Sequence, residues 1–305
     1  MKISVKTVCV WLKYPVAFAL LGLLLSQLDV QALWQSAKDL SLIWVVAALV
    51  CFTISQIIAV LRMNAYYRWH DKQLDFWYSL KLHYVALFYN IVLPGGIGGD
   101  GYKVWLLKKQ AAWPAKQGIQ IQLLTRTNGL LVLALTIMLT LPFVFPAEVN
   151  PLTLAALILC SVLGGGIYMV VLLPILRANR RNEWRALPYS VGVQGFSILT
   201  MLCLWVGLNA TGDAASYILL FQSAAIAGMI PITIGGLGLR EFTFYYGAGI
   251  INALTQHGDV DPETGVLVSL LMFAITLVSA LVGLVWLHTI TRAHPNNTNM
   301  AVDKR

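Results

Sequence analysis

Long apolar segments recur along this chain of 305 residues, and they restrict its possible folds more than any other feature. A hydrocarbon core of about 30 Å needs about 20 helical residues to cross it. Six segments meet that length, and they cover residues 14–33, 42–61, 123–145, 152–176, 187–208 and 266–290. Because 58% of the residues are hydrophobic and only 11% are charged, a soluble protein of this size could not bury them. The sequence therefore predicts an all-α integral membrane protein.

Two further apolar segments, residues 78–105 and 217–254, are each interrupted by the pattern Pro-x-x-Ile-Gly-Gly-x-Gly, which begins at Pro94 and again at Pro231. Proline lacks the backbone N–H and glycine has the largest backbone entropy cost, so both copies break a helix. Two breaks at corresponding positions of two halves are typical of the binding site of an inverted-repeat transporter. We expect six full transmembrane helices plus two re-entrant helical hairpins.

Basic residues predict the orientation of these segments. The basic clusters fall within residues 2–13, 62–72, 108–116, 177–185 and 292–305. All of them lie on one side of the membrane if each hairpin returns to the side from which it enters, and the opposite loops then carry mainly acids. We therefore predict a multi-pass protein of the cell inner (cytoplasmic) membrane with both termini in the cytoplasm. Membrane topology explains the net charge of +8 better than binding of nucleic acid does.

The two copies of the motif lie 137 residues apart (231 − 94), and this offset relates other segments as well. Residues 14–33 and 123–145, shifted by 137, fall on 151–170 and 260–282 and overlap the fourth and the last apolar segments. Paired segments cross in opposite directions, so the repeat is inverted. We predict one membrane domain over residues 1–294, with repeats at about 10–146 and 147–290, and a disordered tail at 295–305.

The two motifs also predict a site for an anion. Glycine turns can present bare N–H groups, and each helix that resumes after a turn has about half a positive charge at its N-terminus, which suits a phosphate. Lys103 and Arg240 follow the turns at matching positions, so they could clamp an anionic headgroup. In the alternative interpretation, the glycines only permit tight packing of the hairpins and the two bases extend to the interface.

Further polar residues near the motifs have several possible roles. Asp100 and Glu241 could cap a helix, pair with the neighbouring bases, hold a cationic headgroup or take up a proton. Arg126 could be an interfacial anchor or a second phosphate contact, and Asn90 could satisfy carbonyls freed by the break. The predicted substrate-binding residues are Asn90, Pro94, Gly95, Gly98, Gly99, Asp100, Lys103, Arg126, Pro231, Gly235, Gly236, Gly238, Arg240 and Glu241.

Residues 90–100, together with Lys103, resemble the first signature of the lysylphosphatidylglycerol synthase transmembrane-region family, which is also called flippase-like. Residues 231–241 are similar to its second signature, and residues 126–129 to a third. Thr125 stands where the family usually has an acid, so Arg126 lacks that partner for an ion pair. In the full-length synthases a soluble aminoacyl-transferase domain follows, for which this chain has no room, so we expect a stand-alone membrane domain.

The resemblance implies movement of an anionic phospholipid or a polyprenyl-phosphate-linked lipid between the leaflets of the inner membrane. We expect a transporter or flippase rather than an enzyme, with no catalytic residues, metal or cofactor. The four cysteines have no metal-ligand spacing, and of the five scattered histidines only His83 lies inside the first broken segment. A small-anion channel or transporter, an intramembrane lipid-modifying enzyme and an accessory subunit in envelope biogenesis are the alternatives. The sequence leaves open whether the chain forms a homo-oligomer or binds an envelope-assembly partner.

Overall fold

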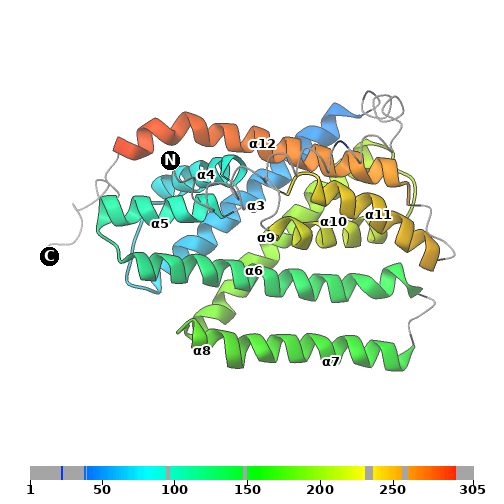
Figure 1. Ribbon diagram of the computed structural model, residues 1–305, viewed down its shortest axis with the longest axis horizontal. Coiled ribbons are helices and arrows are strands. Elements are labelled where there is room, and N and C mark those ends of the chain that lie inside the picture. The colour runs from blue at the N-terminus through cyan, green and yellow to red at the C-terminus, as the bar shows by residue number, and fades with distance from the viewer. Residues whose placement is uncertain are drawn as a thin grey trace, which may run out of the picture.

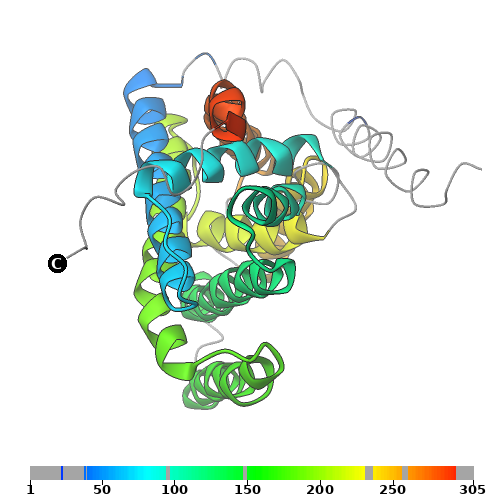
Figure 2. The same cartoon turned by 90° about the vertical axis from the view of Figure 1, so that its left-hand side faces the viewer.

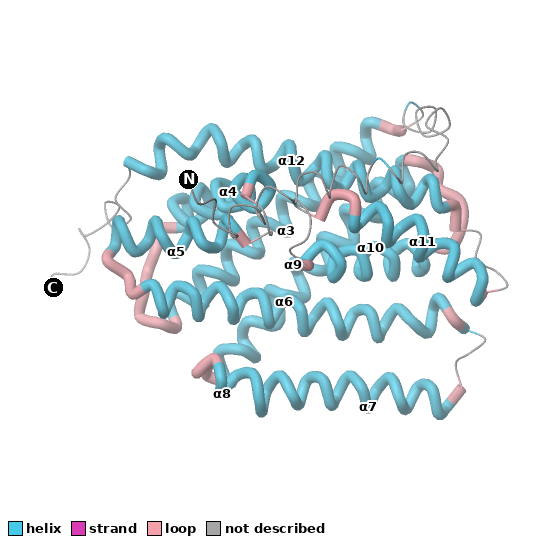
Figure 3. Tube along the Cα trace, in the orientation of Figure 1, coloured by secondary structure: helices cyan, strands magenta, loops and turns pink. Residues whose placement is uncertain are grey.

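The computed structural model describes residues 40–93, 97–146, 150–230, 236–255 and 260–292, together with Gly22 and Lys38. Within these ranges the regular structure is helical and contains no strand (Figure 3). The predicted span at 14–33 and the tail at 295–305 lie outside the described residues, as do the site residues Pro94, Gly95, Pro231 and Gly235.

Five stretches of helix are long and apolar enough to cross a membrane. They are α3 (Leu42–Arg68), α6 (Ala115–Val144), α9 (Arg180–Gly207), α12 (Pro262–Arg292), and a continuous run formed by α7 (Pro151–Ile167), the π-helical turn η2 (Tyr168–Leu172) and α8 (Leu173–Ile175). Each of them covers one of the apolar segments predicted from the sequence. The prediction of an all-α membrane protein is therefore confirmed.

Four shorter helices form two pairs, α4 (Phe76–Val92) with α5 (Gly98–Ala111) and α10 (Ala214–Met229) with α11 (Leu239–Leu254). They contain 14 to 17 residues each. At about 1.5 Å per residue, each is shorter than the ~30 Å of a hydrocarbon core. Figure 1 shows the α4–α5 pair at one end of the molecule and the α10–α11 pair at the other, while α6 and α12 run the whole length. Each pair therefore returns to the end at which it starts.

The first helix of each hairpin, α4 or α10, begins and ends for the same local reasons. Asp75 caps α4 by accepting a hydrogen bond from the N–H of Trp77 at 2.9 Å, and Asp213 caps α10 by accepting one from Ser216 at 3.1 Å. Leu93 and Ile230 follow the last residues of α4 and α10 and have extended backbones, with ψ angles of 134° and 123°. Each of them precedes a proline in the sequence, and a following proline disfavours the helical conformation. The helices therefore stop where the sequence predicts a break.

Helices α3 and α9 form an antiparallel pair that packs against α4, α6, α10 and α12. The hydroxyl of Ser55 donates to the carbonyl of Val193 at 3.1 Å, and near one end of the pair the N–H of Ser41 donates to the carbonyl of Gly207 at 3.1 Å. Helices α3 and α9 begin 138 residues apart (180 − 42), as do α4 and α10 (214 − 76). The view in Figure 2 shows this pair on one side of the bundle and α7 at its lower margin.

The two ends of the bundle carry different charges. The end to which α4 and α5 return carries Arg68, Lys72, Lys108, Lys109, Lys116, Arg177, Arg180, Arg181 and Arg185, together with the acids Asp71, Asp75 and Glu183. At the opposite end the described residues include Asp213, Asp261, Glu263 and Lys38. The molecule therefore has one strongly basic end.

Candidate functional site

A cavity of about 420 Å³ lies where the tip of the α4–α5 hairpin meets α3, α6, α9 and α10. Charged, amide and hydroxyl side chains form part of its lining, and apolar residues form the rest. Helix α10 contributes Ala225 and Met229 close to its C-terminal end, so both short helix pairs reach the same cavity. The cavity therefore lies at the junction of the two halves of the bundle.

Three cations and one carboxylate are the charged groups among the described residues that line the cavity. Arg62 comes from α3, Lys103 from α5 and Arg126 from α6, and the acid is Asp100 from the first turn of α5. The Lys103 side chain is 8% exposed, whereas that of Arg126 is 39% exposed. The formal charge of this lining is +2, and a cleft of one sign within low-dielectric walls attracts ions of the opposite sign.

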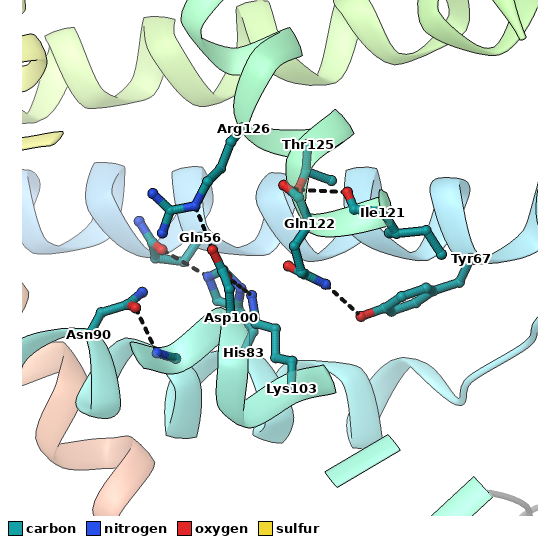
Figure 4. Close-up of polar contacts among 11 residues, drawn as sticks. Gln56, Tyr67, His83, Asn90, Asp100, Lys103, Ile121, Gln122, Thr125 and Arg126 are labelled. Carbon is teal, nitrogen blue, oxygen red and sulfur yellow. Dashed lines mark hydrogen bonds and ion pairs between the residues drawn. The ribbon is translucent and has the colours of Figure 1, made fainter. Parts of the chain in front are cut away.

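Asp100 joins two of these cations, as Figure 4 shows. Its Oδ2 lies 2.5 Å from Nε of Arg126, and its Oδ1 lies 3.4 Å from Nζ of Lys103. Asp100 does not cap α5, because the cap residue is Ile97, which makes no side-chain cap bond. The acid that pairs with Arg126 therefore comes from the glycine motif on the neighbouring helix. Thr125, which stands where the family usually has an acid, donates its hydroxyl to the main-chain carbonyl of Gln122 at 2.8 Å.

The first glycine motif serves the packing of the hairpin as well as the site. The Oδ1 of Asn90 accepts a hydrogen bond from the N–H of Gly99 at 2.8 Å and so ties the end of α4 to the start of α5. Asn90 thus satisfies an amide N–H of the break, whereas the sequence suggested a role toward carbonyls. A Cβ on Gly99 would lie 1.9 Å from the carbonyl oxygen of Ala86, and one on Gly98 would lie 2.4 Å from Cβ of Leu93. These contacts require glycine at both positions.

Three residues of the short motif at residues 126–129 have structural roles. Arg126 pairs with Asp100. Asn128 is buried and donates to Oε2 of Glu183 at 3.0 Å, while its Oδ1 accepts a short hydrogen bond from Ser190. A Cβ on Gly129 would lie 3.3 Å from Nη1 of Arg62, so glycine leaves room for that guanidinium.

One cavity residue, Arg62, and one buried structural residue, Glu183, were not identified from the sequence. Arg62 was assigned to a basic cluster that sets membrane orientation, but it lines the cavity and donates to Oγ of Ser190 at 2.7 Å. Glu183, which lies within another basic cluster, is only 1% exposed, and its Oε2 accepts hydrogen bonds from the hydroxyls of Tyr66 at 2.8 Å and Tyr168 at 2.6 Å. For Arg62, the available signal was an arginine directly after an apolar segment whose helix continues beyond it, because a charged residue within a spanning helix usually faces a polar interior.

Glu241 has a structural role in the second hairpin. It is fully buried, and its Oε2 accepts from the N–H of Gly238 at 2.6 Å while its Oε1 accepts from Ser269 of α12 at 2.8 Å. Gly236 and Gly238 have φ angles of 84° and 86°, a conformation that side chains other than glycine rarely adopt. Glu241 therefore fixes the start of α11 against α12.

Arg240 lies apart from the cavity lining. Its side chain passes between two glycines, since a Cβ on Gly236 would lie 2.9 Å, and one on Gly228 3.4 Å, from its Cδ. Its buried Nε has no hydrogen-bond partner within the described part of the chain. Arg240 is the second residue of α11, whereas Lys103 is the sixth residue of α5, so the two bases sit at different depths along their helices. The structure thus brings together Asn90, Asp100, Lys103 and Arg126, and places Arg240 in the other hairpin.

His83 forms part of the cavity wall through a hydrogen bond between its Nε2 and Oε1 of Gln56 at 3.0 Å. In the ranges that the structure describes, no group of three or more His, Cys, Asp or Glu side chains is placed to hold a metal ion.

Apolar helices of spanning length around a cavity with three cations and one carboxylate in its described lining define a multi-pass membrane protein with a charged internal cavity. The chain belongs to the family described as the lysylphosphatidylglycerol synthase TM region, which it matches over residues 10–187. That match includes the first glycine motif and the motif at residues 126–129, while the second glycine motif lies beyond it. No curated protein matches the chain.

Proposed function

We propose that this protein moves an anionic lipid between the two leaflets of the cell inner membrane, with the lipid headgroup held in the cavity. The observation that carries this proposal is the convergence of Arg62, Lys103 and Arg126 on a space to which the described residues contribute one carboxylate. Such an excess of positive charge is costly inside an apolar bundle and is typical of a site for a charged substrate. Phosphate is the anionic group that membrane lipids most commonly carry.

The size of the cavity supports a headgroup rather than a whole lipid. Pockets for small molecules have volumes of about 300–1,000 Å³. A cavity of about 420 Å³ therefore has room for a phosphate with its attached alcohol, but two acyl chains need far more space. In this proposal the chains stay in the surrounding hydrocarbon while the headgroup crosses. An anionic phospholipid and a polyprenyl-phosphate lipid share the phosphate chemistry that the three cations would bind.

The arrangement that we propose has six transmembrane helices and two re-entrant hairpins of opposite sidedness in an inverted repeat. The shortness of the paired helices, their location at opposite ends of the bundle and the 138-residue offsets support it. The basic end would face the cytoplasm. Because both hairpins reach one cavity, rocking one repeat against the other would expose the headgroup to each leaflet in turn. We assign no catalytic chemistry to the site.

Leaflet exchange in proteoliposomes tests this function. The purified protein is reconstituted with fluorescent phosphatidylglycerol, phosphatidylcholine or polyprenyl phosphate, and flux of inorganic phosphate is measured in parallel. We expect at least one anionic lipid to exchange roughly tenfold faster than phosphatidylcholine, corresponding to about 1.4 kcal/mol of discrimination. Flux of inorganic phosphate without lipid exchange would instead support a small-anion transporter, and a chemically altered headgroup would support a lipid-modifying enzyme.

A further inference from the structure

We propose that Asp100 is a proton-binding site, and that it takes up one proton for each anionic headgroup that enters the cavity. This inference rests on the proposed function, because it assumes that the anion held by the cavity is a lipid headgroup. It adds a second transported species, a proton that moves with the lipid.

The first step of the argument is competition for the same donors. The carboxylate of Asp100 forms an ion pair with Nε of Arg126 at 2.5 Å and a second, longer one with Nζ of Lys103 at 3.4 Å. Both cations line the cavity, so these are the groups that a phosphate entering the cavity would contact. Asp100 thus stands where the substrate anion would bind, and a phosphate that binds Nε of Arg126 displaces the carboxylate from it.

The second step concerns the displaced carboxylate. The Asp100 side chain is only 16% exposed, and an ionised carboxylate that loses its partners in such a setting costs several kcal/mol. Protonation removes this cost, and the neutral acid can then donate a hydrogen bond to a phosphate oxygen. A proton from water binds the carboxylate oxygen that leaves Arg126, and it returns to water when the phosphate departs and the ion pairs form again.

The charge balance supports coupling of one proton to one anion. The cavity lining carries +2 when Asp100 is ionised. A singly charged phosphodiester removes one unit and the proton restores it, so the charge within the apolar bundle is unchanged on binding. If the anion bound without the proton, the carboxylate of Asp100 and the lipid phosphate would compete for the same cations. A like charge nearby disfavours the ionised form of an acid.

The other titratable or charged groups that face Asp100 are Arg62 and Tyr67 from α3 and His83 from α4. Arg62 donates to Ser190 at 2.7 Å, and the hydroxyl of Tyr67 accepts from Gln122 at 3.2 Å. The residues that α9 and α10 contribute to the cavity are uncharged. His83 is the rival proton acceptor, because its buried Nδ1 has no partner among the described residues. It therefore provides the comparison variant.

The test measures proton uptake on lipid binding by the full chain in nanodiscs. The probe is short-chain phosphatidylglycerol, whose phosphodiester stays singly ionised from acid to mildly alkaline pH. Calorimetry in buffers of different ionisation enthalpy counts the protons taken up. We expect close to one proton to be taken up per lipid bound. Between the pKa of Asp100 in the lipid-free protein and its pKa in the lipid-bound protein, the affinity for the lipid should fall about tenfold for each unit rise in pH.

Substitutions assign the proton to a residue. Asp100→Asn is expected to bind the lipid without proton uptake and with no dependence on pH, while Asp100→Glu and His83→Gln keep the proton count whatever their affinities. Wild-type protein that binds the lipid without taking up a proton would overturn this inference alone, and this result does not depend on any variant folding. Proton uptake that persists in Asp100→Asn, or that is lost in His83→Gln, would also overturn it.

Two further outcomes concern the ligand rather than the proton. Absence of lipid binding by the wild-type protein would overturn both this inference and the proposed function. Dimethyl phosphate provides the same singly charged phosphodiester without a lipid, and we expect it to bind at least roughly tenfold more weakly. Equal affinity for dimethyl phosphate, with the same proton count, would overturn the assignment to a lipid headgroup.

Discussion

Arg126 and Asp100, 26 positions apart in the sequence, form an ion pair in which Nε and Oδ2 lie 2.5 Å apart. The pair connects α6 to the first turn of α5, and Asp100 also contacts Lys103. The two cations are therefore held toward one space before any ligand arrives. Groups that are already ordered lose less conformational entropy on binding.

The role of Arg62 in the cavity predicts that Arg62→Ala lowers the rate of lipid exchange. A hydrogen bond to a charged group contributes about 1.5–3 kcal/mol, so the expected loss is roughly tenfold or more. Arg68→Ala is the matched control, since Arg68 is exposed at the end of the same helix. Exchange rates in proteoliposomes measure both variants, and equal rates for the two would contradict a binding role for Arg62.

The close approach of α4 and α5 predicts that Gly99→Ala destabilises the protein. The added Cβ would lie 1.9 Å from the carbonyl oxygen of Ala86, so the two helices must separate. Overpacking of this kind costs about 1–3 kcal/mol. Gly101→Ala is the control, because a Cβ there meets nothing within 4 Å. Alanine favours a helix over glycine, so Gly101→Ala should unfold at or slightly above the wild-type midpoint. Thermal unfolding in detergent should show a lower midpoint for Gly99→Ala only, and an equally lowered midpoint for both variants would contradict a specific clash at Gly99.

The buried position of Glu183 predicts a second effect on stability. Replacing Glu183 by Ala removes the acceptor that Tyr66, Tyr168 and Asn128 share. Each buried donor left unsatisfied costs about 1–3 kcal/mol, so the loss should exceed that of most single substitutions. Glu183→Gln, which keeps an oxygen acceptor, should lose less. Arg181→Ala, an exposed neighbour, should unfold like the wild type, and an undiminished midpoint for Glu183→Ala would refute the network.

The orientation is tested by labelling single cysteines in a protein whose native cysteines have been replaced. Lys109 is exposed at the basic end of the bundle and Thr211 at the opposite end. With a membrane-impermeant maleimide, Thr211→Cys should react in intact cells and Lys109→Cys only after the membrane is opened. The reverse pattern would require the opposite orientation.

The sequence predicted the helices well because their causes are local. Apolar runs define the spans, and Leu93 and Ile230 end α4 and α10 directly before prolines. The site was predicted in part. Lys103 and Arg126 were selected as phosphate contacts, and Asp100 as a possible partner of the neighbouring base Lys103. The pairing of Asp100 with Arg126 was not predicted, because it depends on how α5 packs against α6 and sequence spacing does not determine that packing.

Other site residues could not be found because their role arises from contacts distant in sequence. Arg62 faces Ser190 of α9, 128 residues away, and Glu183 accepts from Tyr66, 117 residues away. In the sequence, both charges belong to clusters that read as membrane-orientation signals. Arg240, in contrast, was assigned to the site from the sequence but lies outside the cavity lining. Its position after the second glycine motif predicted a partner for Lys103, yet the structure packs its stem between Gly228 and Gly236.

The most direct test of the central claim compares leaflet exchange of fluorescent phosphatidylglycerol in proteoliposomes for two double variants of equal charge. Lys103→Ala with Arg126→Ala removes two cations from the cavity, and Lys108→Ala with Lys109→Ala removes two exposed cations from the end of α5. If the cavity holds the headgroup, the first variant exchanges lipid at the rate of protein-free vesicles while the second matches the wild type. Wild-type exchange by the Lys103 and Arg126 double variant would contradict the account.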